Sequence, residues 1–173
     1  MSVRTCSVIA VMIVLAVLRS AAQSVTIRSD LLTDWTSMRD TMTKIADAMP
    51  EDKLGYKPTP AQRSYGEQIL HVAVDNVAMM KFLGAKTPAP AIDKNAASKA
   101  EVLKALADSF DYGSAVIREQ TDRSIAETVQ VPNFVGTRAR LVWSAIGHAW
   151  DEYGVMTVYL RLNGIVPPAS RGM

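Results

Sequence analysis

One periodic pattern constrains this chain more than any other feature: apolar side chains recur every three or four residues. Near residues 27–49 the pattern comprises Ile27, Leu31, Trp35, Met38, Met42, Ile45 and Met49. This spacing places all seven on one face of an α-helix, whereas a half-buried strand would require strict alternation. The sequence contains no alternating segment of useful length and no internal repeat. It therefore predicts an all-α fold.

Three further segments carry helical signals with recognisable ends. Ser64 with Glu67, and Ser98 with Glu101, form capping boxes, in which a hydroxyl and a carboxylate accept from the free backbone donors of a helix start. The predicted helices cover residues 64–83, 98–119 and 137–163, and glycine or proline follows the first and the last of them.

The connections between these helices are expected to be irregular. Residues 51–63 and the stretch GAKTPAPAIDKNAA (84–97) are rich in proline or alanine, and residues 120–136 are expected to hold one short helical turn at residues 124–128. Four long helices joined in this way favour an up-and-down four-helix bundle. The predicted single domain covers residues 23–173.

The N-terminal segment differs from the rest of the chain. Arg4 precedes an apolar run from Cys6 to Leu18, and Ser20-Ala21-Ala22 supplies the small side chains of a cleavage site. The run is shorter than the roughly 20 apolar residues of a membrane span. We therefore expect residues 1–22 to be a cleaved signal peptide and the protein to be exported, to the periplasm or the extracellular space. An uncleaved anchor is the alternative.

Removing residues 1–22 changes the charge and the redox chemistry of the chain. The 19 Lys and Arg residues lose Arg4 and Arg19, which leaves 17 against 17 Asp and Glu. A neutral domain without a basic stripe is not expected to bind nucleic acid. The only cysteine, Cys6, leaves with the signal, which excludes disulfides and thiolate chemistry in the mature chain. No stable membrane span is expected after processing.

The two histidines are the strongest candidates for a functional site. His148 lies on a stripe of the last helix with Leu141, Ala145, Glu152, Val155 and Tyr159, and His71 lies midway along the apolar second helix. An i, i+4 pair on one helix plus one side chain from a facing helix supplies three ligands. Three ligands leave open positions for water or substrate, as in catalytic metal sites. The sequence thus points to a metal bound by His71, His148 and Glu152.

Other interpretations of these residues stay open. A histidine in a core is commonly a hydrogen-bonded structural residue, and Glu152 could pair with an arginine such as Arg118, Arg138 or Arg140. Asp75 lies one turn after His71, where it could orient His71, serve as a general base or simply be solvated. Gly147 and Gly154, seven residues apart, predict a close approach of a neighbouring backbone, most simply in helix packing.

Two segments resemble the signatures of the DinB/YfiT-like superfamily: YKPTPAQRSYGEQILHVA (56–73) and GHAWDEYGVMTVYLRLNGIVPPAS (147–170). The resemblance implies a four-helix bundle with a metal centre made of one histidine on the second helix and a His-x3-His pair on the last. His71 and His148 match two of these positions. Glu152 stands where the family has its third histidine, and Val155 replaces a common glutamine.

The resemblance implies a mononuclear divalent metal, with Zn, Ni and Mn as candidates, and hydrolase- or transferase-type chemistry on an unknown small molecule. Thiol transfer is less expected in an exported protein, because low-molecular-weight thiol cofactors are cytoplasmic. The alternative is a non-catalytic bundle that binds a ligand or partner and keeps a vestigial metal site. A homodimer also stays open.

The processing prediction can be checked directly. N-terminal sequencing of the exported protein should give a first residue at Gln23 or within two or three residues of it, because Ser20 and Ala22 occupy the −3 and −1 positions. Recovery of residues 1–22, still attached, from a membrane fraction would contradict this prediction.

Overall fold

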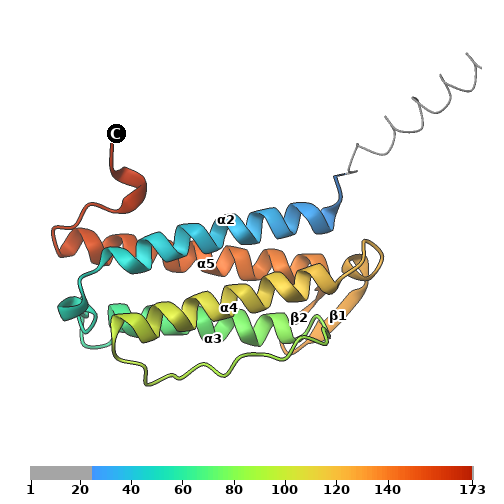
Figure 1. The fold of residues 1–173 in the computed structure, drawn as a ribbon, viewed down its shortest axis with the longest axis horizontal. Coiled ribbons are helices and arrows are strands. Elements are labelled where there is room, and N and C mark those ends of the chain that lie inside the picture. The colour runs from blue at the N-terminus through green and yellow to red at the C-terminus, as the bar shows by residue number, and fades with distance from the viewer. Residues whose placement is uncertain (1–24, 173) are drawn as a thin grey trace, which may run out of the picture.

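Four α-helices form a bundle in the computed structural model, which describes residues 25–172 (Figure 1). The helices are α2 (Ile27–Ala48), α3 (Tyr65–Lys81), α4 (Lys99–Glu119) and α5 (Arg138–Leu162). The four predicted helices are confirmed, with ends that agree to within two residues. The predicted signal segment lies outside the described residues.

The helix starts follow the capping chemistry of the sequence. The Ser64 hydroxyl accepts from the Glu67 backbone N–H at 3.2 Å, and the Glu67 carboxylate accepts from the Ser64 backbone N–H at 2.6 Å. This backbone hydrogen bond, together with Lys57, lowers the pKa of the Glu67 carboxyl. Ser98 and Glu101 form the second predicted box. Both capping predictions are confirmed.

The order of the helices departs from a strict up-and-down bundle. Within the bundle α2 packs against α4 and α5, and α3 packs against the same two helices. Glu119 at the end of α4 accepts from the backbone of Lys86, just after the end of α3, so α3 and α4 run in the same direction. Residues 82–98 return along the length of the bundle, at its lower edge in the view, from the end of α3 to the start of α4 (Figure 1). The predicted bundle is confirmed, but this connection crosses its length, which an up-and-down order does not include.

A small hairpin precedes α5 where an irregular connection was predicted. Strands β1 (Thr128–Val131) and β2 (Phe134–Thr137) pair antiparallel, and Asn133 in the turn has φ 62°. Each strand has only four residues and neither is fully buried, so the alternation is too short to distinguish it from a loop. The predicted helical turn before the hairpin is present as a 3-10 helix, Ser124–Ala126.

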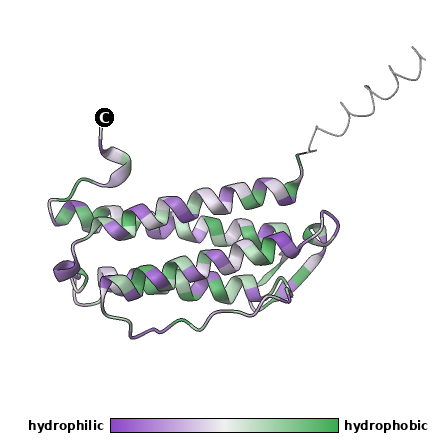
Figure 2. Cartoon of the chain, viewed as in Figure 1, coloured by the Kyte–Doolittle hydropathy of each residue, from purple (hydrophilic) through white to green (hydrophobic). Residues whose placement is uncertain are grey.

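Trp35 of α2 fixes the packing of α2 against α4. Its indole is fully buried, and its Nε1 donates to the Phe110 carbonyl at 2.9 Å. Gly113 of α4 makes the space, since a Cβ there would lie 2.3 Å from the indole ring. The rest of the predicted α2 stripe is buried except Ile27, which is 62% exposed. Hydrophobic residues run along α3, whereas α2 alternates hydrophobic and hydrophilic turns (Figure 2).

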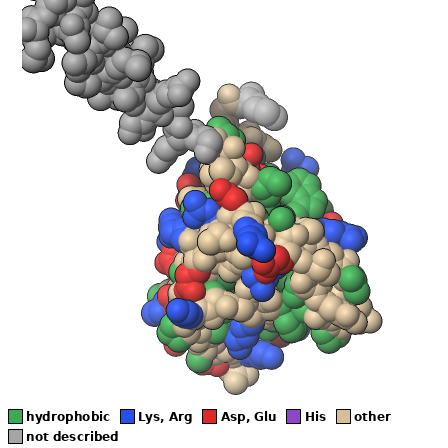
Figure 3. Space-filling model, turned by 90° about the vertical axis from the view of Figure 1, so that its right-hand side faces the viewer, with side chains coloured by type: hydrophobic (Ala, Val, Ile, Leu, Met, Phe, Trp, Pro, Cys, Tyr) green, Lys and Arg blue, Asp and Glu red, His purple; other side chains and the backbone are tan. Residues whose placement is uncertain are grey.

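The surface at the hairpin end of the bundle carries both signs of charge. Lys and Arg side chains alternate there with Asp and Glu, and hydrophobic side chains lie between them (Figure 3). None of the helices that the structure describes combines the length and apolarity needed to cross a membrane.

Gly113→Ala should lower the free energy of unfolding in urea by about 1–3 kcal/mol, because the added methyl overpacks against the Trp35 indole. The loss is expected although alanine is the better helix former. Trp35→Leu provides the control, since in that background Gly113→Ala should cost much less. Equal costs in both backgrounds would show that the indole does not require this glycine.

Candidate metal centre

The site lies where α3 and α5 pack against each other. The helices are antiparallel, and the Tyr159 hydroxyl near the end of α5 donates to the Arg63 carbonyl just before α3 at 3.0 Å. Burial raises the pKa of the Tyr159 phenol, which keeps this donor protonated. This register sets His71 opposite His148, with ring centroids 5.0 Å apart and planes at 83°.

Glu152 completes a group of three donors. Its Oε1 lies 3.3 Å from the His71 Nε2, and one ligand atom from each of His71, His148 and Glu152 lies within 4.8 Å of the others. A metal with bonds of about 2.0–2.2 Å would bring such donors to roughly 3–4 Å from one another. The expected convergence of the three side chains is present, and a metal ion could be held between them. That they bind a metal stays a prediction.

Two of these donors are buried without a hydrogen-bond partner. The His148 Nε2 and the Glu152 Oε2 are both inaccessible to solvent and unpartnered among the described residues. The Glu152 side chain is only 11% exposed. The other oxygen of this carboxylate, Oε1, has only the His71 Nε2 nearby, at 3.3 Å. Burying a carboxylate oxygen that lacks a hydrogen-bond partner is costly, and a cation between the donors would remove that cost. The orphaned atoms therefore fit a metal ion.

No arginine neutralises Glu152. Of the alternative partners considered from the sequence, Arg138 pairs with Glu127 at 3.7 Å, and Arg140 contacts the Phe134 ring and the Val135 carbonyl. Arg118 forms no ion pair among the described residues, where its carbonyl accepts from Arg28. The arginine interpretation of Glu152 is therefore wrong.

Asp75 lies within ion-pair distance of both histidines. Its Oδ2 lies 3.2 Å from the His148 Nε2 and 3.6 Å from the His71 Nε2. The contact with His148 is within ion-pair distance, but these two atoms do not form a hydrogen bond. Asp75 is 34% exposed, so it forms the solvent side of the cluster. It is not the isolated solvated acid that its sequence position also allowed.

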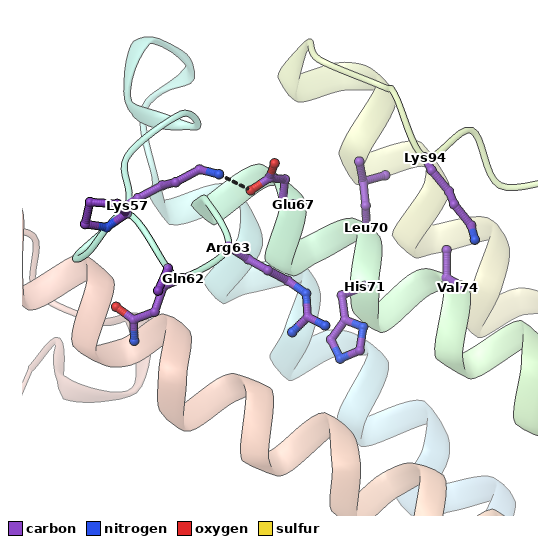
Figure 4. A pocket seen from close by; sticks show the side chains of 10 residues that line it. Lys57, Gln62, Arg63, Glu67, Leu70, His71, Val74 and Lys94 are labelled. Atoms are coloured by element: carbon purple, nitrogen blue, oxygen red, sulfur yellow. Dashed lines mark ion pairs between the residues drawn. The ribbon is translucent and has the colours of Figure 1, made fainter.

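A hollow of about 460 Å³ opens beside His71. Arg63 extends into it from the loop before α3, toward the imidazole, while Lys57 pairs with Glu67 at its rim (Figure 4). Lys94 of the 82–98 connection lines the same hollow. Arg63 also lines a second hollow, of about 540 Å³, which includes Glu152 and Tyr159. The first hollow thus opens onto His71 and the second onto Glu152, and Arg63 lines both.

Arg63 was not predicted from the sequence, and the predictions for three residues of α5 differ from the structure. Arg63 directly precedes the capping residue Ser64, and this position beside a helix start was the available signal. Val155 is 37% exposed, so it does not belong to the core stripe. Nothing lies within 4 Å of a Cβ built at Gly147 or Gly154. The predicted close approach of a backbone at these glycines is wrong within the single chain.

Comparisons with known proteins agree with this architecture. The family model of the DinB superfamily matches residues 34–156. The structure of a DinB-like protein from Bacillus cereus ATCC 10987 is similar, with a TM-score of 0.72 and 17% identity, over 80% of this chain and 93% of that one. A DinB-like protein from Bacillus subtilis, YjoA, gives 0.61 and 17%, over 78% and 92%. No curated protein matches the chain.

Adding Zn²⁺, Ni²⁺ or Mn²⁺ to metal-free protein should raise the melting temperature, and a chelator should reverse the effect. A ligand that binds only the folded state stabilises it by about 2.7 kcal/mol at a hundredfold excess over Kd. His148→Ala should abolish the response, and Glu152→His should keep or strengthen it. Asp151→Asn, an exposed neighbour on α5, should behave as wild type. A wild-type melting curve indifferent to all three metals would argue against the site.

Proposed function

Since the chain belongs to the DinB superfamily, we propose that it binds one divalent metal ion at His71, His148 and Glu152 and uses it on a small anionic molecule. The chemistry we propose is of the hydrolase or transferase type. The observation that carries the proposal is the pair of buried, unpartnered donor atoms, the His148 Nε2 and the Glu152 Oε2, at the point where three ligand atoms converge.

The donor set limits the choice of metal. Two imidazole nitrogens and one carboxylate oxygen suit Zn, Ni and Mn, and the absence of sulfur disfavours soft metals. Three protein ligands leave at least one coordination position to water or substrate. Bound there, the metal would supply a Lewis acid that polarises a substrate oxygen or activates water.

The residues around the hollow beside His71 would bind and orient the substrate. In the hollow beside His71, Glu67 cancels the charge of Lys57, and Arg63 and Lys94 form no ion pair among the described residues. The hollow therefore carries a positive charge that attracts a carboxylate or a phosphate. The Arg63 guanidinium can hold such a group with two parallel hydrogen bonds.

Asp75 would act as the general base and then the general acid in this reaction. It is the most exposed acid of the cluster and lies beside both imidazoles. A nucleophile that enters from the solvent side passes its carboxylate, which can accept a proton at Oδ2 and return it to the leaving group. Glu152, on the buried side, would serve as a metal ligand.

We further propose that the protein acts after export. The support is the sequence of residues 1–22, with Arg4, a short apolar run and small residues at positions 20 and 22. The substrate is then a molecule met outside the cytoplasm.

Turnover of chromogenic carboxylic esters that stops with a chelator would support a hydrolase. Metal and anion binding without turnover would favour the non-catalytic binding bundle.

Arg63→Gln should weaken the binding of small anions to the metal-loaded protein by about tenfold, the value of one charge-assisted interaction. The measurement is the change in the visible spectrum of Co²⁺-loaded protein on titration with succinate or inorganic phosphate. Arg161→Gln, an exposed residue in the last turn of α5 that lines neither hollow, serves as the matched control. If Arg63→Gln and Arg161→Gln bind both anions as wild type does, Arg63 does not anchor the substrate.

A further inference from the structure

The outer face of α5 exposes large apolar side chains along its length. Trp143 is 61% exposed, Trp150 53%, Val158 52% and Leu162 58%. The Trp150 ring also contacts the Tyr153 ring edge-on at 5.5 Å, which extends the aromatic surface. Tryptophan is rarely left in water to this extent without a partner, and contiguous patches of this kind mark interaction sites.

Two glycines lie between these tryptophans on the same face. Gly147 and Gly154 follow Trp143 and Trp150 by four residues each, so the face reads Trp, Gly, Trp, Gly at a spacing of four, three and four. This is the spacing of a helix–helix seam. Glycine is a weaker helix former than alanine, so two glycines on one face of a helix need another reason. Within residues 25–172, nothing lies within 4 Å of a Cβ placed on either one.

The stripe is symmetric about the midpoint between His148 and Ala149. Trp143 and Gly154 lie equally far from this point, and so do Gly147 and Trp150. Ala139 and Val158 extend the symmetry by one turn. If two copies of α5 are paired antiparallel on a two-fold axis through this midpoint, every tryptophan lies opposite a glycine of the other copy.

We propose that the protein forms a two-fold symmetric homodimer through the outer faces of two antiparallel α5 helices. Each Trp143 fills the notch above Gly154 of the other copy, and each Trp150 fills the notch above Gly147. The absent glycine side chains let the helices approach closely, as small residues do at other helix seams. A two-fold interface uses one self-complementary patch, and this stripe has that property.

The exposed area fits a second copy. An aromatic side chain of this kind buries about 150–250 Å². With Val158 and Leu162 included, and with both copies counted, the apolar area covered is on the order of 1,000 Å², where specific interfaces begin. A reversible dimer is therefore expected. The interface lies on the outside of the helical turns whose inner side carries His148 and Glu152, and its formation does not require the metal.

Sedimentation equilibrium over a wide concentration range tests the dimer. Wild type should dissociate reversibly from dimer to monomer. Trp143→Glu should raise the dissociation constant about a hundredfold. The substitution occurs once in each copy, and each occurrence is expected to weaken the dimer about tenfold. Lys104→Glu lies on α4, which is diagonal to α5, and should leave the constant unchanged. A wild type that is monomeric at every concentration would overturn the proposal.

Cysteine cross-linking tests the register separately, with Cys6, the only native cysteine, replaced by serine. Trp143→Cys and Gly154→Cys chains should form a disulfide when mixed. Neither should cross-link alone, because the symmetry places like positions about 16 Å apart along the axis. Cross-linking of either variant with itself and not in the mixture would overturn this register. Equally, a dimer that Trp143→Glu leaves intact would place the interface elsewhere.

Discussion

The antiparallel contact between α3 and α5 is the interaction on which the rest of the structure depends. It brings together two helices that are distant in the sequence, and the hydrogen bond from the Tyr159 hydroxyl to the Arg63 carbonyl fixes their register at one end. That register sets His71 opposite His148 and lets Glu152 reach the His71 imidazole. It also holds the Arg63 loop between the two hollows. A shift of α3 against α5 by one helical turn, about 5.4 Å, would separate His71 from both His148 and Glu152.

Glu152 changes the electrostatics of a site in which the family has a third histidine. An imidazole ligand is neutral, whereas a carboxylate ligand contributes a negative charge, and Glu152 is only 8% exposed. A divalent ion bound here would keep a net charge nearer one than two, and with Asp75 alongside, nearer zero. Under the proposed function, the positive charge that attracts an anionic substrate would then come from Arg63 and Lys94 instead of from the ion. These cationic residues would matter more here than beside three imidazoles.

The sequence alone predicted the four helices because their signals are local. Capping at Ser64 and Ser98 and the spacing of the α2 stripe depend on residues within a few turns. The convergence of His71, His148 and Glu152 was also predicted, with the help of the family resemblance. The direction of α4 was not predicted, because no local signal in residues 82–98 indicates that this connection spans the bundle. The hairpin was missed because four-residue strands show too little alternation. The open faces of Gly147 and Gly154 could not be foreseen, since a glycine signals close approach without saying to what.

The long return of residues 82–98 determines how this bundle can assemble. In a bundle whose helices follow one another as hairpins, each pair closes a short loop and folding is fast. Here the consecutive helices α3 and α4 run parallel, so residues 82–98 must span the bundle before these two helices can pack, and α2 packs on α4 and α3 on α5 across longer separations. The entropy of closing these long loops is lost before the core repays it. Folding is therefore expected to be slower than in a helical bundle of the same length built from consecutive antiparallel hairpins.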